Sequence, residues 1–273
     1  MVTTKNNKHF LFTCDVENVG PGTEKGVHKF LELLSGYNLI GTFFVTYRIL
    51  NDYPNIVEEI VKCGHEIASH GYSHPYLERD YLYLNSLPKE QIEKEINLSF
   101  NKFHEKGINV KGFRAPAFKI NEYTLDCIRK WFEYDSSSVN FLFRTGRNAG
   151  LYKKIYSDEK TTFIPVTSIG KLRVPFGSPY FLAFGSKTGN IIQKNLLKNG
   201  VAVFYCHCYD LIKVNPEFKA AKKIIPQLVY LNLCGTKRAY QFYQTLLSTA
   251  LDLGYHFITC SELTELLKNG DTT

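Results

Sequence analysis

The stretch Gly64-His65-Glu66-Ile67-Ala68-Ser69-His70-Gly71-Tyr72-Ser73-His74 combines a predicted strand with two histidines four residues apart. Gly64 ends a predicted helix, and the apolar run after it is typical of a short buried strand. Gly71 gives the turn after the strand a conformational freedom that other residues lack, so the two imidazoles can converge on one ion. Two neutral imidazoles suit zinc or a similar divalent metal, and an anionic ligand normally completes a hydrolytic site. For this spacing alone, two turn histidines without a ligand role are the alternative.

The order of helix, strand and polar residue in this stretch recurs along the chain. Further apolar strands are predicted at 9–14, 41–45, 110–114, 201–206 and 255–259. Strands alternate with helices over the whole length without a linker, which indicates one α/β domain over 1–273 with a parallel sheet. The helices are predicted at 26–35, 52–63 (capped by Asp52), 88–106, 121–131, 189–199, 217–230, 237–253 and 262–268 (capped by Ser261).

Polar residues follow several of these strands at the point where each strand ends. In a (β/α) barrel the active site lies at the carboxyl ends of the strands, so these side chains are expected to meet there. Two of them, Asp15 and Glu17, should share one face of the first strand because side chains alternate along a strand. The complete set is Asp15, Glu17, His70, His74, Arg114, Asp135 and His207.

Each of these residues also has a structural interpretation. Asp15 and Glu17 can be a solvated turn cluster, and Arg114 can pair with a surface acid. His207 can be a satisfied core histidine instead of a general acid. Asp135 can be a turn or capping residue before Ser136-Ser137-Ser138. Their common position at strand ends favours function.

Composition excludes several classes of protein. Of 273 residues, 44% are hydrophobic and 22% charged, which is ordinary for a globular domain. The net charge of +7 comes from small scattered basic groups without a long basic run, so we expect no nucleic-acid partner. Part of this charge can attract an anionic substrate such as a sugar carried on phosphate.

Cysteine usage and the absence of long apolar segments predict a cytoplasmic protein. The seven cysteines are odd in number, lie mostly in apolar runs and form no CxxC motif, which indicates reduced, buried thiols. The polar stretch 1–8 has no segment of signal-peptide length, and no later stretch reaches the length of a transmembrane span. We therefore expect no integral membrane segment, and the sequence does not indicate an oligomeric state.

The ordered motifs resemble the polysaccharide deacetylase family, the NodB-homology domain of carbohydrate esterase family 4. The resemblance spans about residues 9–265, and the subgroup it resembles most has Asp-Val-Glu in its first motif in place of the commoner Asp-Asp. The motifs that carry it are Thr13-Cys14-Asp15-Val16-Glu17-Asn18, Ser69-His70-Gly71-Tyr72-Ser73-His74, Gly112-Phe113-Arg114-Ala115-Pro116, Tyr134-Asp135-Ser136-Ser137 and Phe204-Tyr205-Cys206-His207.

This resemblance implies a distorted, TIM-like (β/α)7 barrel and a divalent metal, usually zinc. It implies that His70 and His74 bind the metal, that Arg114 holds the base carboxylate, that Asp135 supports Arg114 and that His207 is the general acid. Val16 stands where the family has its second Asp, a metal ligand. Either Glu17 is the ligand and Asp15 the base, which we prefer because Glu has the longer reach, or Asp15 itself binds the metal.

The function expected from the resemblance is metal-dependent removal of an N-acetyl group from an amino sugar. The expected substrate is an N-acetylated sugar, and a cytoplasmic precursor linked to a nucleotide or a lipid phosphate is favoured over finished cell wall. Two alternatives stay open. One is another C–N hydrolase, a deformylase or cyclic amidase, and the other is a metal-free glycan-binding pseudoenzyme.

Overall fold

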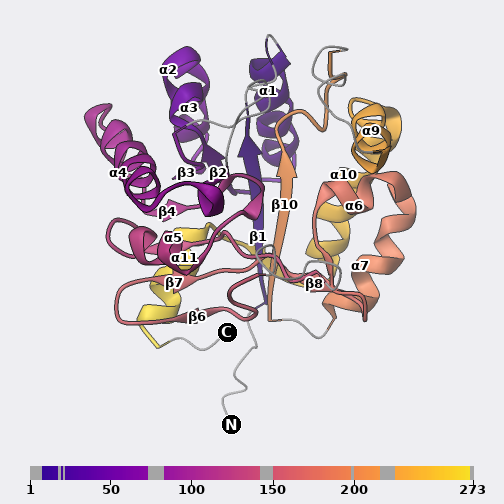
Figure 1. Cartoon of the computed structure of the whole chain (residues 1–273). Coiled ribbons are helices and arrows are strands. Elements are labelled where there is room, and N and C mark those ends of the chain that lie inside the picture. The colour runs from indigo at the N-terminus through magenta and orange to yellow at the C-terminus, as the bar shows by residue number, and fades with distance from the viewer. Residues whose placement is uncertain are drawn as a thin grey trace.

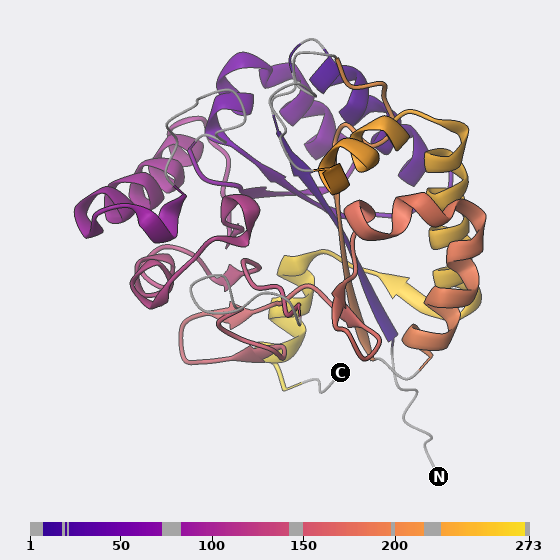
Figure 2. The same ribbon diagram turned by 45° about the vertical axis from the view of Figure 1, so that its right-hand side comes forward.

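A curled, mostly parallel sheet forms the centre of the molecule, and helices lie around its outside (Figures 1 and 2). The computed structural model describes residues 8–17, 20, 22–72, 83–141, 150–197, 200–215 and 225–270. Its strands lie in the order β10-β1-β2-β3-β4-β5-β7-β6; β6 is antiparallel to β7, and β11 pairs with the start of β1. The curled parallel sheet confirms the predicted α/β fold of the distorted (β/α)7 type.

The elements follow one another in the expected alternation. The strands are β1 (Lys8–Val16), β2 (Thr42–Val45), β3 (Glu66–Ser69), β4 (Gly112–Phe113), β5 (Tyr134–Asp135), β6 (Tyr156–Ser157), β7 (Thr162–Phe163), β8 (Ser168–Ile169), β9 (Val174–Pro175), β10 (Val201–His207) and β11 (Tyr255–Phe257). The α-helices are α1 (Gly22–Ser35), α2 (Tyr47–Asp52), α3 (Pro54–Lys62), α4 (Lys89–Glu105), α5 (Glu122–Ile128), α6 (Ser178–Phe181), α7 (Thr188–Leu196), α9 (Ile225–Leu233), α10 (Lys237–Asp252) and α11 (Cys260–Lys268). Short 3₁₀ turns lie at Leu84–Ser86, Pro116–Phe118 and Leu182–Lys187.

Alternation along β1 separates two apolar layers. Phe12 points outward and packs against Phe30 of α1 and Tyr243 of α10. Leu11 points the other way into a smaller cluster inside the barrel, and Asp15 shares its face two pleats further on. The barrel interior is therefore apolar in the middle and polar at the end where β1 and β10 stop. The inner cluster consists of Leu11, Phe44, Ala68, Tyr134, Ile164, Val203, Cys260 and Leu263.

Between β7 and β10, single contacts close the barrel in the part of the chain that the structure describes. The N–H of Thr167 donates to the carbonyl of Val203 (3.1 Å), and the N–H of Val203 donates to the Thr167 hydroxyl (2.8 Å). Further along, the N–H of Tyr205 donates to the carbonyl of Phe176 (3.1 Å). The backbone of Gly177 lies so close that an added Cβ would meet the Tyr205 ring at 2.1 Å. We call these contacts the seam of the barrel.

The opposite end of the barrel is held by Glu66 at the start of β3. Its carboxylate accepts hydrogen bonds from the hydroxyls of Thr42 and Tyr134, both at 2.8 Å. It also accepts from the backbone N–H of Ser261 (3.1 Å) and from the Ser261 hydroxyl. Burial raises the pKa of Glu66 above its ordinary value. Glu66 thereby fixes the start of α11 against the barrel.

Two helix starts differ from prediction. Asp52 ends the unpredicted helix α2, and Tyr53 precedes α3 without a side-chain cap. The last helix is capped by Thr259 instead of Ser261, because Ser261 is engaged by Glu66. Thr259 and Glu262 form a capping box in which each side chain accepts from the backbone N–H of the other, at 3.1 and 2.7 Å. The structure begins α9 at residue 225, so most of the helix predicted at 217–230 lies outside the described residues.

All seven cysteines are described, and all are free thiols. Six are buried as predicted, and Cys63, at the end of α3, is exposed. Burial raises the pKa of Cys14 and Cys208 well above the ordinary value, which makes these thiols unreactive. Among the described residues, no helix has the length and apolar composition needed to cross a bilayer.

Candidate active site

Arg114 follows β4 and lies fully buried at the mouth of the barrel, the end formed by the C-termini of β1, β3, β4 and β10 (upper end in Figure 1). Its Nη1 donates to Asp15 Oδ1 (2.8 Å) and Thr13 Oγ1 (2.9 Å). Its Nη2 and Nε donate to the side-chain and backbone oxygens of Ser136, at 2.8 and 3.3 Å. The guanidinium carbon lies 3.9 Å from the centroid of the Phe44 ring. These contacts hold the guanidinium, and with it Asp15, in one orientation.

Asp15 is a buried carboxylate with a compensating charge. Burial by itself would raise its pKa, but Arg114 and the nearby imidazoles of His70 and His207 lower it, and the pKa lies below the ordinary value. Asp15 is therefore ionised at neutral pH, although it is only 3% exposed and bulk water is largely excluded from it. The predicted pair of Arg114 with an acid of the first motif is present, with Asp15 as the acid.

His70 follows β3 and is held in a form that suits a metal ligand. Its Nδ1 lies 2.8 Å from the backbone carbonyl oxygen of Arg114. A carbonyl can only accept, so Nδ1 carries the proton and Nε2 carries the lone pair. Burial lowers the pKa of His70, which keeps the ring neutral. A metal-binding histidine usually has this arrangement, with its second nitrogen bonded to a backbone carbonyl or carboxylate.

Glu17 and His207 lie together at the same end of the barrel. Glu17 comes directly after β1 and is 1% exposed. Its Oε1 lies 3.8 Å from His207 Nε2. His207 ends β10 and is paired in register with Asp15 on β1. Burial lowers the pKa of His207. The two acids of the first motif are thus both buried, with Asp15 bonded to Arg114 and Glu17 beside His207.

A tyrosine and an acid that sequence reasoning missed lie behind His207. The Tyr230 hydroxyl on α9 is 2.8 Å from His207 Nδ1 and also bonds to the buried carboxylate of Asp210. Asp210 comes three residues after His207, and this short spacing was the one available signal. Tyr230 is 23 residues away on a helix, and no pattern in the sequence connects it to the site.

Asp135 makes no hydrogen bond or ion pair with Arg114, although the Arg114 charge acts on its carboxyl; the direct contacts to the guanidinium come from Ser136. The Asp135 carboxylate accepts hydrogen bonds from the hydroxyls of Ser137 (2.5 Å) and Tyr152 (2.6 Å). Tyr152 packs in the outer apolar layer, whereas Ser136 faces the barrel interior. Successive residues on a strand point to opposite faces, so only Ser136 can reach the guanidinium. Burial raises the pKa of Asp135 to about 6.

The turn after Arg114 has an unusual backbone. Ala117 and Phe118 both have positive φ, 53° and 57°, which is rare for residues with a side chain. The turn brings the Phe118 ring 5.5 Å from the Arg114 guanidinium and 5.0 Å from the Tyr205 ring. Strain of this kind costs about 1–3 kcal/mol and collects at functional sites. Here it places an aromatic ring beside the buried ion pair.

His74 lies outside the described residues, so the predicted pair of metal histidines is described at His70 alone. The described part of the chain contains no group of three His, Cys, Asp or Glu side chains close enough to bind one ion. The donors that are present nevertheless fit a divalent cation. His70 presents the Nε2 lone pair, and two buried carboxylates, Asp15 and Glu17, lie at the same mouth.

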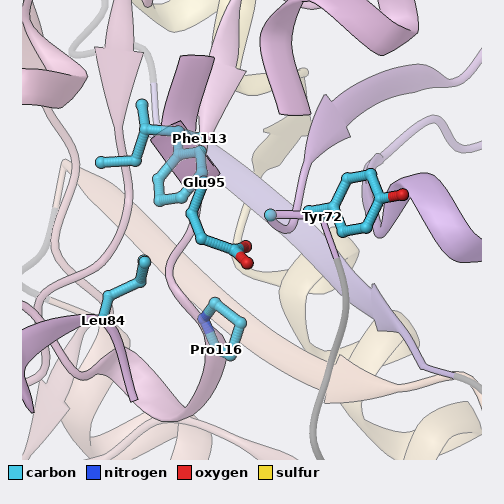
Figure 3. A pocket seen from close by; sticks show the side chains of 7 residues that line it. Tyr72, Leu84, Glu95, Phe113 and Pro116 are labelled. Atoms are coloured by element: carbon cyan, nitrogen blue, oxygen red, sulfur yellow. The ribbon is translucent and has the colours of Figure 1, made fainter. Parts of the chain in front are cut away.

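A small pocket lies next to the mouth, between α4 and β4 (Figure 3). The carboxylate of Glu95 points into it beside Pro116, and Gly71 forms part of its wall. The chain turns at Gly71 with φ +83°, a conformation that glycine adopts without strain. None of the predicted site residues that the structure describes lines this pocket, so the pocket is separate from the candidate site.

A family model described as polysaccharide deacetylase matches residues 3–131, which include the first three motifs. Over these residues the chain is similar to the polysaccharide deacetylase family. The peptidoglycan-N-acetylmuramic acid deacetylase PdaA of Bacillus subtilis is 31% identical over 108 residues, or 38% of each protein. The chain spans well under half the length of the curated relatives that it matches.

Solved structures share the fold of this chain over nearly its whole length. A structure from Mycobacterium smegmatis, provisionally assigned as a polysaccharide deacetylase, has a TM-score of 0.64 at 18% identity and covers 100% of this chain and 94% of its own. A carbohydrate esterase family 4 pseudoenzyme from Bacillus anthracis has a TM-score of 0.57 at 13% identity and covers 95% and 66%. Because a pseudoenzyme shares the fold, the fold alone does not establish catalysis.

Proposed function

We propose that this protein is a metal-dependent carbohydrate N-deacetylase that hydrolyses the N-acetyl group of an amino sugar. The observation that carries the proposal is the buried Asp15–Arg114 pair at 2.8 Å, with His70 and His207 close enough to lower the pKa of the Asp15 carboxyl. A fixed, ionised carboxylate between two imidazoles is suited to proton transfer at a hydrolytic centre. Asp15, His70, Arg114 and His207 also all belong to the motifs that carry the family resemblance.

The cation, most simply zinc, would be held by His70 and Glu17, with His74 as the further ligand that the family resemblance implies. Such an ion lowers the pKa of a water molecule toward neutrality and polarises the acetamide carbonyl. Because the Nδ1 proton of His70 is directed to the Arg114 carbonyl, Nε2 is the ring nitrogen that would bind the ion. Asp15 is not assigned as a metal ligand, because its Oδ1 already accepts a hydrogen bond from Arg114.

The chain's own groups carry the proton steps. Asp15 accepts a proton from the water that attacks the acetamide carbon, and Arg114 keeps the carboxylate oriented for this transfer. His207 donates a proton to the departing amine as the C–N bond breaks. Attack releases one proton and departure of the amine consumes one, so amide plus water gives acetic acid plus amine, which are acetate and an ammonium group at neutral pH.

The proposed substrate is an N-acetylated amino sugar. Relatives in the family are named as peptidoglycan deacetylases of N-acetylmuramic acid and N-acetylglucosamine. The net charge of +7 supports a sugar that carries phosphate, either nucleotide-linked or lipid-linked. A cytoplasmic location, which would favour such precursors, stays a prediction.

The test is acetate release by the purified full chain, combined with elemental analysis for metal. The substrates are chitin oligomers, peptidoglycan fragments, UDP-N-acetylglucosamine and a panel of formyl and cyclic amides. We expect acetate from at least one N-acetylated sugar, and a loss of about 100-fold or more in Asp15→Asn, in the range of lost general-base catalysis. Turnover restricted to formyl or cyclic amides would replace the proposal with another C–N hydrolase.

A second function is supported by Val16 at the position of the family's usual second Asp and by the pseudoenzyme with the same fold. In that case the chain binds a glycan without hydrolysing it. It would then bind N-acetylglucosamine oligomers in calorimetry, contain no stoichiometric metal and release no acetate. Metal at about one equivalent together with acetate release would exclude this alternative.

A further inference from the structure

The two ring nitrogens of His207 face different surroundings. Nε2 is turned toward the mouth, 3.8 Å from Glu17 Oε1, whereas Nδ1 is turned inward, 2.8 Å from the Tyr230 hydroxyl. The ring also stacks on Tyr209 with a centroid distance of 5.0 Å and an interplanar angle of 15°. This stacking and the Tyr230 contact fix which nitrogen faces the site.

The hydrogen-bond donors around Asp210 determine the direction of the bond between Tyr230 and His207. Asp210 is fully buried and receives the hydroxyls of Tyr230 and Tyr243 and the backbone N–H of His207. A carboxylate has no proton to give, so the single hydroxyl proton of Tyr230 is directed to Asp210. The Tyr230 oxygen then offers only lone pairs to its other neighbours, His207 and the Ser178 hydroxyl at 3.5 Å.

It follows that His207 Nδ1 must be the donor in this contact. The neutral ring then carries its proton on Nδ1 and its lone pair on Nε2, facing the mouth. A protonated ring carries the additional proton on Nε2, which is the atom that can reach a substrate. If Nδ1 lost its acceptor, the neutral ring could place its proton on either nitrogen.

We propose that Tyr230, oriented by Asp210, is a positioning residue that holds the ring proton of His207 on Nδ1 and so makes Nε2 the nitrogen that exchanges protons with the substrate. The catalytic consequence rests on the proposed function, whereas the position of the proton does not. The same logic operates in serine proteases, where a buried carboxylate holds the tautomer of the catalytic histidine. Here a tyrosine lies between the acid and the imidazole.

The first experiment measures the tautomer directly. The full chain is labelled with ¹⁵N-histidine, and long-range ¹H–¹⁵N spectra are recorded at pH 8, with the His207 signals assigned from a His207→Gln variant. We expect the wild type to show the proton on Nδ1 and Tyr230→Phe to show a shift toward the Nε2–H form. A wild-type ring with its proton on Nε2 overturns the proposal, and so does an unchanged tautomer in Tyr230→Phe.

The second experiment measures turnover on the best substrate from the acetate screen. For Tyr230→Phe we expect kcat to fall by about 10- to 100-fold with KM unchanged, the scale of lost outer-shell contacts. Tyr243→Phe is the matched control, because it removes a hydroxyl from the same carboxylate without touching His207. It should keep the wild-type tautomer and a kcat within about twofold of wild type, a change of less than about 0.5 kcal/mol.

An equal fall of kcat in Tyr243→Phe would show general loosening of the Asp210 region and would overturn the positioning role. If the wild type releases no acetate from any substrate, the proposed function fails, but the tautomer spectra still decide whether Tyr230 holds the proton. If Tyr230→Phe does not fold, the wild-type spectrum alone remains decisive, since Nε2–H there contradicts the inference.

Discussion

At the residue scale, Tyr134, Asp135 and Ser136 show how adjacent positions take different roles. Tyr134 and Ser136 point into the barrel, to Glu66 and Arg114, and Asp135 points outward to Tyr152. The sequence could predict that a polar residue at this strand end would support Arg114, and the resemblance assigned this role to Asp135. It could not predict the face on which each residue falls, because β5 is only two residues long and offers no alternating pattern.

Substitutions of the two acids of the first motif, Asp15 and Glu17, should affect metal content and turnover differently. Glu17→Gln should lose bound metal together with activity, because it removes the anionic ligand. Asp15→Asn should keep the metal and lose turnover by about 100-fold or more, because it removes the proton acceptor. Metal content per chain by mass spectrometry and acetate release measure the two effects.

If instead Asp15→Asn loses the metal and Glu17→Gln keeps it, Asp15 is the metal ligand. Asp15→Asn also leaves the Arg114 charge buried without its partner, which costs about 3–5 kcal/mol. A urea unfolding curve must therefore show that the variant is folded under assay conditions.

The raised pKa of Asp135 predicts that the stability of the folded protein depends on pH. Its pKa in the folded protein is about 6, against an ordinary 3.8, so the folded state favours the protonated form. This stability is fully present below about pH 4 and is lost as the pH rises from about 4 to about 6, by about 3 kcal/mol in total. Asn does not ionise, so the Asp135→Asn variant should not show this loss of stability as the pH rises.

The measurement is the free energy of unfolding in urea from pH 4 to pH 7 for both proteins. The free energy of unfolding of Asp135→Asn minus that of the wild type should increase as the pH rises. Asp126→Asn is the matched control, since Asp126 is exposed and pairs only with a neighbouring surface arginine. If the two proteins lose stability in parallel, the pKa of Asp135 is not raised.

At the scale of elements, most strands and helices were predictable because apolar spacing and caps mark them in the sequence. The start of α11 was not, because its cap depends on a tertiary contact. Ser261 has a good capping side chain, but Glu66 from β3 takes its hydroxyl, and the cap moves to Thr259. Local propensity gives way when a buried acid elsewhere needs the same donor.

Glu66→Ala should lower the free energy of unfolding by about 3 kcal/mol, because several buried donors lose their acceptor at about 1–3 kcal/mol each, partly offset by relaxation and water. Glu66→Gln should cost less, since it keeps one acceptor oxygen. Urea unfolding measures both, and Glu58→Ala on the exposed face of α3 is the control. Because Glu66 lies at the end of β3 away from the mouth, kcat of the folded variants should stay near wild type. A cost equal to that of Glu58→Ala would remove Glu66 from the contacts that hold α11.

At the scale of the whole molecule, the sequence predicts the barrel but does not predict where it closes, at the seam between β7 and β10. Alternating strands and helices indicate a parallel barrel, but they say nothing about where a hydrogen-bonded ladder stops. The described structure closes between β7 and β10 through Thr167, Phe176 and Gly177, which lie in segments with little apolar periodicity. Two backbone hydrogen bonds, one side-chain acceptor and one close backbone approach replace a continuous ladder there.

Thr167→Val should weaken this seam, because the buried N–H of Val203 loses its acceptor at a cost of about 1–3 kcal/mol. Hydrogen exchange should become faster at the Val203 amide, whereas amides in the β1–β2 ladder should keep their protection relative to global stability. Thr245→Val on α10 serves as a control away from the seam. Equal acceleration in both variants would mean that the seam does not open as a separate unit.

The distribution of thiols gives the protein an internal reporter. With Cys63 on the surface and the other six inside, a thiol reagent should modify one equivalent at once and the rest only as fast as the interior opens. Cys14 precedes Asp15 in the chain, and Cys208 donates its backbone N–H to the Asp15 carbonyl and its thiol to the Glu17 carbonyl, so a sugar bound over the two acids would slow the modification of both thiols. Ligands could therefore be screened by labelling kinetics on the unmodified chain, before any enzymatic assay exists.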